Sequence, residues 1–186
     1  MVLAALKSAA TWLILINLAS FLVSLLLLKR PSAKQAYDRL PRGLQKLLVL
    51  FNVGPLLLLP FVSQSRLSWH WAYAASGALL VALALVFWVL AMRQIGAIPS
   101  MKARERVVSG SVYGIVRHPI YLGNVLVTFG LGLMARGTLT LLYGLVVLAF
   151  YILLIHAEED SLITEYGDEY RLYQQKVTRR LIPYLY

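Results

Sequence analysis

Five long apolar segments within only 186 residues constrain this chain more than any other feature. They cover residues 9–28, 44–63, 70–92, 120–135 and 138–156. A helix that spans a bilayer needs about 20 mainly apolar residues, so the first three segments suffice and the last two are slightly short. Because lipid offers no partners to backbone polar groups, such segments must be helical. The pattern predicts an all-α polytopic membrane protein with about five transmembrane helices.

The composition agrees with a membrane environment. Hydrophobic residues make up 60% of the chain, and the mean hydropathy is +0.71. A soluble protein of this size has too much surface for its volume to hide so many apolar side chains. We expect one membrane domain over residues 1–186, in which residues 1–84 carry no motif and residues 85–186 carry the polar motifs.

Basic residues concentrate on one predicted side of the membrane. Residues 29–46 hold six of them, residues 93–117 hold five and the tail after residue 157 holds four, against three on the other side. All eight acidic residues fall on the basic side. The positive-inside rule predicts an N-terminus outside and a C-terminus in the cytoplasm, and we expect a prokaryotic inner membrane. The formal charge of +10 then indicates contact with membrane lipids and not with nucleic acid.

The last two apolar segments predict a tight helical hairpin. They are joined by Arg136 and Gly137 alone. We expect Gly130, Gly132 and Gly144 to let the fourth and fifth helices approach each other closely. After this hairpin, the spacing of apolar and aromatic residues over 160–176 predicts an amphipathic helix on the membrane surface, interrupted near residue 167.

Two polar clusters flank the hairpin and should meet at one level. Pro119 suits the first turn of a helix, where its missing N–H costs nothing. His118 lies 19 residues before Gly137, and Glu158 lies 21 residues after it. At 1.5 Å per residue, both return to a depth of about 30 Å from the turn. We therefore expect His118 and Glu158 to share a pocket at the cytoplasmic surface.

The charges of the two clusters are complementary. A helix start is an anion site, which Arg117 and His118 would strengthen. The paired carboxylates of Glu158 and Glu159 would attract a cation. Such a pocket suits a zwitterionic amino-acid moiety. Each group also has a structural interpretation, because basic residues anchor helix starts and a charge run often follows a helix.

Tyr113 and Tyr121 flank the first cluster. Their rings could stack on a base or face a cation. Tyrosines at this depth also serve as an aromatic belt at the membrane surface. The chain has no cysteine and no helical histidine signature, so we expect no metal site.

The sequence from Val107 to Gly123 resembles the signature of isoprenylcysteine carboxyl methyltransferases and the related phospholipid N-methyltransferases. The resemblance continues through Glu158-Glu159, Tyr166 to Tyr170 and Ile182-Pro183. It covers about residues 85–184, including the stretch 92–96, and marks 85–186 as a methyltransferase core.

The resemblance implies S-adenosylmethionine as the cofactor. The residues that it implies for cofactor binding are Arg106, Val107, Val108, Tyr113, His118, Pro119, Tyr121, Glu158 and Glu159. We add two catalytic candidates. Arg117 could orient an anionic group, and Glu159, or alternatively His118, could serve as a base.

The resemblance implies a lipophilic or prenylated methyl acceptor, with an isoprenylcysteine carboxylate first. A phospholipid amine and a thiol remain alternatives, as do a membrane reductase on a related scaffold and a non-enzymatic membrane protein. The chain departs from the family pattern at Ser111-Val112, where Gly-Pro is common. It also has Leu154 at the position where isoprenylcysteine enzymes carry an arginine that helps to hold the substrate.

Overall fold

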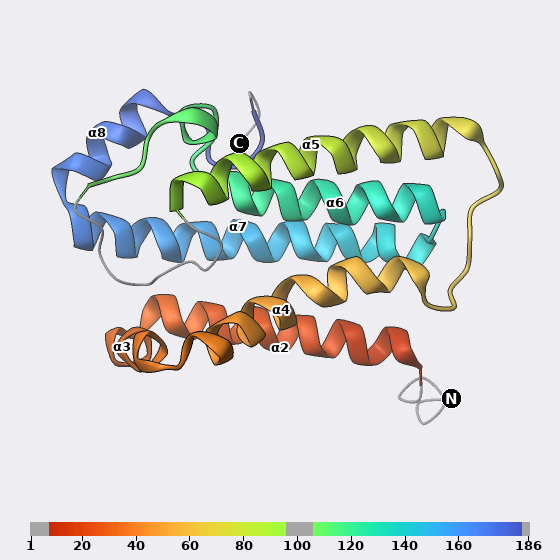
Figure 1. Ribbon diagram of the computed structural model, residues 1–186, viewed down its shortest axis with the longest axis horizontal. Coiled ribbons are helices and arrows are strands. Elements are labelled where there is room, and N and C mark those ends of the chain that lie inside the picture. Colours follow the sequence, from red (N-terminus) through yellow and green to blue (C-terminus); the bar gives the residue numbers. More distant parts are fainter. Residues whose placement is uncertain (1–7, 96–105, 184–186) are drawn as a thin grey trace.

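The computed structural model describes residues 8–95 and 106–183. Every regular element in this part of the chain is helical (Figure 1). The elements are α2 (Ala9–Lys29), α3 (Pro31–Arg39), α4 (Arg42–Leu58), the 3₁₀ turn η1 (Leu59–Phe61), α5 (Trp71–Ile95), the 3₁₀ turn η2 (Ser111–Gly114), α6 (Pro119–Ala135), α7 (Thr138–Tyr166) and α8 (Asp168–Lys176).

Each of the five apolar segments forms a helix, so the predicted all-α polytopic membrane fold is confirmed. Within the described ranges, α2, α4 with η1, α5 and α7 are long and apolar enough to cross a membrane. The fifth helix, α6, is apolar throughout but has only 17 residues. Leucines and tryptophans remain exposed along α2 and α5, as expected for surfaces that face lipid.

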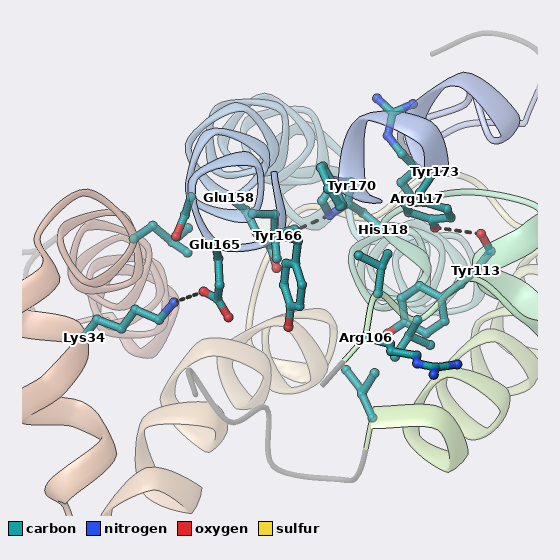
Figure 2. A pocket seen from close by; sticks show the side chains of 16 residues that line it. Lys34, Arg106, Tyr113, Arg117, His118, Glu158, Glu165, Tyr166, Tyr170 and Tyr173 are labelled. Atoms are coloured by element: carbon teal, nitrogen blue, oxygen red, sulfur yellow. Dashed lines mark hydrogen bonds and ion pairs between the residues drawn. The ribbon is translucent and has the colours of Figure 1, made fainter. Parts of the chain in front are cut away.

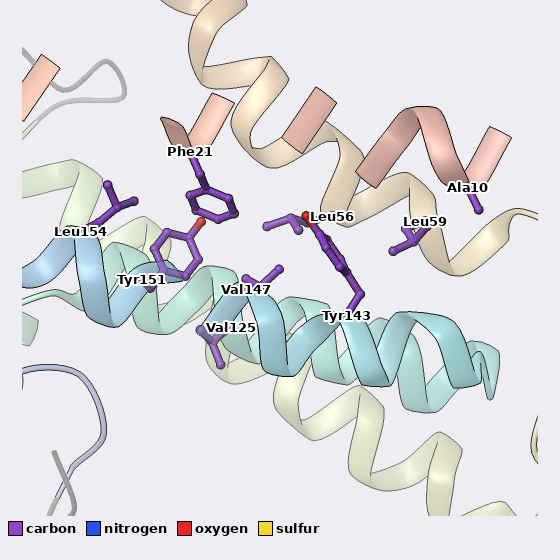
Figure 3. Packing of buried hydrophobic residues seen from close by; sticks show 9 residues of the cluster. All are labelled: Ala10, Phe21, Leu56, Leu59, Val125, Tyr143, Val147, Tyr151 and Leu154. Carbon is purple, nitrogen blue, oxygen red and sulfur yellow. The ribbon is translucent and has the colours of Figure 1, made fainter. Parts of the chain in front are cut away.

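The helices form two layers (Figure 1). Helix α6 packs between α5 and α7, while α2 packs on α4 and α7 from the other side. A cluster of buried apolar residues joins the layers, with Phe21 and Leu56 opposite Val147 and Tyr151 (Figure 3). Helices α3 and α8 both lie at the end of the bundle opposite the start of α2 (Figure 1). These two polar helices thus gather at one end, while residues 96–105 of the polar segment 93–117 lie outside the described part of the chain.

A polar chain also crosses this apolar interior. The indole of Trp88 on α5 donates to Asn124 on α6, whose amide donates to the hydroxyl of Tyr151 on α7. Tyr151 donates to Asn52 on α4, and Asn52 donates to Ser20 on α2. Because lipid cannot replace these partners, interhelical hydrogen bonds of this kind fix the relative positions of helices.

The hairpin of α6 and α7 is as tight as predicted. Helix α6 ends at Arg136 in the left-handed conformation, with φ 58°, and α7 begins two residues later. Gly132 faces Leu141 of α7, and Gly144 faces Phe129 of α6. Their expected role in bringing these two helices together is confirmed.

The expectation for Gly130 was wrong, because this glycine faces α5 and not α7. A Cβ on Gly130 would lie 2.9 Å from the carbonyl oxygen of Gly77, and one on Gly77 would lie 2.6 Å from the carbonyl oxygen of Gly130. Both positions are too close for a side chain. Gly130 therefore allows the close approach of α5 and α6, and not that of α6 and α7.

The C-terminal helix also differs from the expectation. Residues 157–166 continue α7 instead of belonging to a separate surface helix. The predicted interruption is present, because Gly167 adopts φ 56° and ψ −126° and thus lets α8 turn away. Tyr170 and Tyr173 of α8 are buried, so this face packs against the protein. The predicted helix ended at residue 156 because the residues that follow are polar, although α7 continues to Tyr166.

The α5–α6 contact predicts a specific sensitivity to a single methyl group. We expect Gly77→Ala to destabilise the protein by about 1–3 kcal/mol, since its Cβ would overpack against backbone atoms. The measurement is the thermal unfolding midpoint of the purified protein in detergent. Gly43→Ala is the matched control, because no atom lies within 4 Å of its Cβ position. Equal midpoints for the two variants would contradict this packing.

Candidate cofactor-binding site

The start of α6 is built as predicted. Pro119 occupies the first helical position, and His118 is the N-cap residue. The backbone N–H of Arg117 donates to the carbonyl oxygen of Arg179 at 2.9 Å, and that of His118 donates to Arg180 at 3.0 Å. The C-terminal tail thus fixes the two residues before α6. This pairing cannot be predicted from side-chain types, because it uses backbone atoms only.

His118 lies between two carboxylates of α7. Its Nδ1 is 3.3 Å from Oε2 of Glu158, and its Nε2 is 3.3 Å from Oε1 of Glu159. The side chain of His118 is almost completely buried. The prediction that His118 and Glu158 return to a shared level is confirmed.

This position shifts the titration of His118. Burial lowers its pKa, but the neighbouring carboxylates of Glu158 and Glu159 raise it more, so the net pKa lies above its usual value of 6.5. A neutral imidazole has one N–H, whereas the imidazolium has two and can face both carboxylates. The geometry therefore favours the protonated ring.

Glu159 acts as a buried link between three parts of the chain. Its Oε1 accepts from Nε of Arg117 at 2.7 Å, and its Oε2 accepts from Gln174 at 3.3 Å and Arg180 at 3.2 Å. Arg117 also donates to the carbonyl oxygen of Val177 at 2.6 Å. Glu159 is only 3% exposed. Its oxygens are thus directed at α8 and the tail.

Glu158 has the opposite orientation. Its side chain lines a pocket and is 30% exposed. Its buried Oε2 lies 3.3 Å from Nδ1 of His118, so this ring holds the carboxylate in place. The exposed part of the carboxylate is available to a cationic ligand in the pocket.

The pocket lies at the polar end of the bundle, between α7, α8 and the segment before α6 (Figure 2). The predicted residues that line it are Arg106, Val107, Val108, Tyr113, Arg117, His118 and Glu158. Three others lie behind this lining. Tyr121 stacks on the His118 ring with centroids 5.6 Å apart, Pro119 begins α6, and Glu159 makes the contacts described above.

Several residues that line the pocket were not among the site residues predicted from the sequence. Ser161, Leu162, Glu165 and Tyr166 follow Glu158 on the same face of α7, so helical periodicity could have found them once α7 was extended. Tyr170 and Tyr173 of α8, within the segment predicted to lie on the membrane surface, also line the pocket. Leu28 and Lys34 come from α2 and α3, where the sequence offered no motif.

Two contacts attach α8 to the segment before α6. The hydroxyl of Tyr173 donates to the carbonyl oxygen of Tyr113 at 2.7 Å. The backbone N–H of Val107 donates to Oε1 of Glu169 at 2.9 Å. These contacts hold the walls of the pocket together. Leu154, by contrast, lies in the apolar cluster of Figure 3 and not in the pocket.

Comparison with known proteins agrees with this arrangement. Residues 72–169 match the phospholipid methyltransferase family, a segment that covers more than half of the chain and contains α5, η2, α6 and α7. The chain belongs to this family. Glu158, Glu159 and His118 fall within the matched segment.

Curated relatives are similar over shorter stretches. A Delta(14)-sterol reductase of Mus musculus is 38% identical over 92 residues, which are 48% of this chain and 22% of that protein. Methanethiol S-methyltransferase 1 of Bradyrhizobium diazoefficiens is 41% identical over 73 residues, 39% of this chain and 25% of the relative. Protein-S-isoprenylcysteine O-methyltransferase of Schizosaccharomyces pombe is 36% identical over 72 residues, which are 38% of this chain and 30% of that protein. The chain thus aligns with less than a third of each relative.

The His118 contacts predict a pH dependence of stability. Since the folded state raises the pKa of His118, its contribution is complete below about pH 6.5 and is lost as the pH rises through the higher folded value. We expect the difference in thermal midpoint between the wild type and His118→Gln to shrink as the pH rises from about 6.5. A difference that stays constant or grows over this range would refute the protonated ring.

Glu159→Gln should destabilise the protein by about 3 kcal/mol, because it leaves the buried Arg117 without its counter-ion. The measurement is again the thermal midpoint in detergent. Asp160→Asn, one residue further along α7, is an exposed control and should change little. If both variants unfolded at the same temperature, Glu159 would not be the structural link described here.

Proposed function

We propose that this protein transfers a methyl group from S-adenosylmethionine to a lipophilic or membrane-associated acceptor. The observation that carries the proposal is Glu158, a carboxylate that lines the pocket, keeps 30% of its side chain exposed and is held in place by His118. Membership of the phospholipid methyltransferase family supports the reaction class. The two methyltransferases among the relatives support it further.

The lining of the pocket fits the chemistry of this cofactor. Glu158 would accept from its ammonium group, and the sulfonium adds a second positive charge to the ligand. The cationic side chains of Arg106 and His118 would attract its carboxylate. The aromatic rings in the lining offer faces for stacking and for a cation. They belong to Tyr113, Tyr166, Tyr170 and Tyr173.

Bound S-adenosylmethionine supplies a methyl group that is already activated by its sulfonium. The residues of the chain then have to position the reactants, which is worth up to about 7–11 kcal/mol in ideal geometry. His118 holds Glu158 in place, and Tyr121 supports the His118 ring from behind. Arg117 and Glu159 join this wall to the tail. Their contacts favour a positioning role for both residues.

The acceptor decides whether a base is needed. A carboxylate, such as that of an isoprenylcysteine, is ionised near neutral pH and can be methylated directly. A phospholipid amine or a thiol has to lose a proton first. We place the carboxylate first because the two candidate bases, Glu158 in the lining and Glu159 behind it, already serve as counter-ions of His118.

We also propose that the polar end of the bundle, with α3, α8 and the pocket, faces the cytoplasm. Its basic residues support this orientation. The protein would then act as one membrane domain, in which the methyltransferase core receives pocket residues from the N-terminal helices. Leu28 and Lys34 are these contributions.

A membrane reductase is the second candidate, because the sterol reductase of Mus musculus aligns over 92 residues. A reductase that uses NADPH must bind phosphate groups, so its site should be rich in unopposed cations. The carboxylate of Glu158 in the pocket lining is unfavourable for such a ligand. Binding of NADPH therefore separates the two functions.

Calorimetry on the protein in nanodiscs tests the proposal. We expect binding of S-adenosylmethionine and of its demethylated product, and none of NADPH. Glu158→Gln should weaken the binding of S-adenosylmethionine at least about tenfold, because a charge-assisted hydrogen bond is lost. Asp168→Asn, which alters an exposed carboxylate on α8, should not change it.

Binding of NADPH without S-adenosylmethionine would overturn the proposed function in favour of a reductase. Unchanged affinity in Glu158→Gln would keep the reaction class but remove Glu158 from the site.

A further inference from the structure

One part of the pocket comes from outside the segment that matches the family. Lys34 of α3 lines the pocket and pairs with Oε2 of Glu165 on α7. The side chains are only 24% and 16% exposed, so both charges are partly withdrawn from water. Residue 34 precedes the matched segment 72–169, whereas residue 165 lies within it.

The position of Lys34 is set by the packing of α3. Tyr37 follows three residues later on the same face and is buried, at 6% exposure. The side chain of Gln45 donates to the carbonyl oxygen of Tyr37 at 3.0 Å, which fixes α3 against α4. The face of α3 that carries Lys34 is therefore directed at the bundle.

The pocket has two ends with different chemistry (Figure 2). Arg106 and Tyr113 lie at one end and Lys34 and Glu165 at the other, with Tyr166 between them. The proposed cofactor groups occupy the first end. Leu28, near the end of the apolar helix α2 that precedes α3, also lines the pocket. An apolar wall beside a cation suits an acceptor with an apolar chain and an anionic head.

We infer that Lys34 binds the anionic group of the methyl acceptor and that Glu165 is the counter-ion which this acceptor displaces. The inference rests on the proposed function and names the acceptor class of the same site. An anionic ligand can take the place of Glu165 beside Lys34, so Lys34 stays paired while the displaced carboxylate loses its partner. Glu165 keeps Lys34 neutralised when no acceptor is bound.

An anionic acceptor is favoured over a cationic one by the charges of the lining. Lys34, Arg106 and the protonated His118 oppose only Glu158 and Glu165, since Glu159 neutralises Arg117. S-adenosylmethionine itself brings a net positive charge. An acceptor anion reduces this excess, whereas an ammonium group would increase it.

Two matched ligands test the inference without turnover. The full chain in nanodiscs of zwitterionic lipid is saturated with S-adenosylhomocysteine, and the affinities of N-acetyl-S-dodecylcysteine and its methyl ester are measured by calorimetry. The acid and the ester share the same apolar chain and differ in the anionic group. We expect the wild type to bind the acid about tenfold more tightly than the ester, as for a charge-assisted contact.

Lys34→Gln should remove this preference for the acid, and Glu165→Gln should increase it, because Lys34 then has no internal competitor. Lys29→Gln is the matched control, since Lys29 is basic and exposed at the nearby end of α2. It should keep the wild-type ratio.

Equal ratios in Lys34→Gln and Lys29→Gln would overturn the inference while the proposed function stands. Dodecylamine serves as a cationic ligand in the same experiment. If the wild type bound dodecylamine more tightly than the acid, and Glu165→Gln weakened the binding of dodecylamine, the inference would be overturned in favour of a cationic acceptor. If S-adenosylhomocysteine failed to bind at all, the proposed function would fail first, and the inference with it.

Discussion

The imidazole of His118, held between the carboxylates of Glu158 and Glu159, is the interaction on which the site depends. It joins the start of α6 to the end of α7, two helix ends that the apolar hairpin brings to one level. Both carboxylates are adjacent in sequence and could not share this space without a cation between them. A protonated histidine supplies that cation and still presents a flat ring on which Tyr121 stacks.

The two adjacent glutamates have separate tasks because successive residues of a helix point about 100° apart. Glu159 turns toward α8 and the tail, where Gln174 and Arg180 donate to it, and it also accepts from Arg117 before α6. Glu158 lines the pocket and keeps 30% of its side chain exposed. One carboxylate thus stabilises the wall, and the other is available to a ligand.

Much of the fold could be predicted from segment lengths alone, because lipid forces apolar stretches of about 20 residues to be helical. Counting residues from Gly137 also placed His118 and Glu158 at one level. The sequence could not tell which glutamate faces the pocket, since that depends on the rotation of α7 about its axis. Nor could it assign Gly130 to α5, or Lys34 to the pocket, because these contacts join segments far apart in the chain. The tail contacts were hidden for a different reason, as they use backbone atoms.

The nitrogen NMR spectrum of His118, in protein labelled only at histidine, tests the central claim most directly. The chain has three histidines, so His70→Gln and His156→Gln would assign the signals. The pH at which His118 loses one ring proton should lie above the usual histidine value of about 6.5, and Glu158→Gln should lower it. Loss of the proton at or below about pH 6.5, unaffected by Glu158→Gln, would contradict the account.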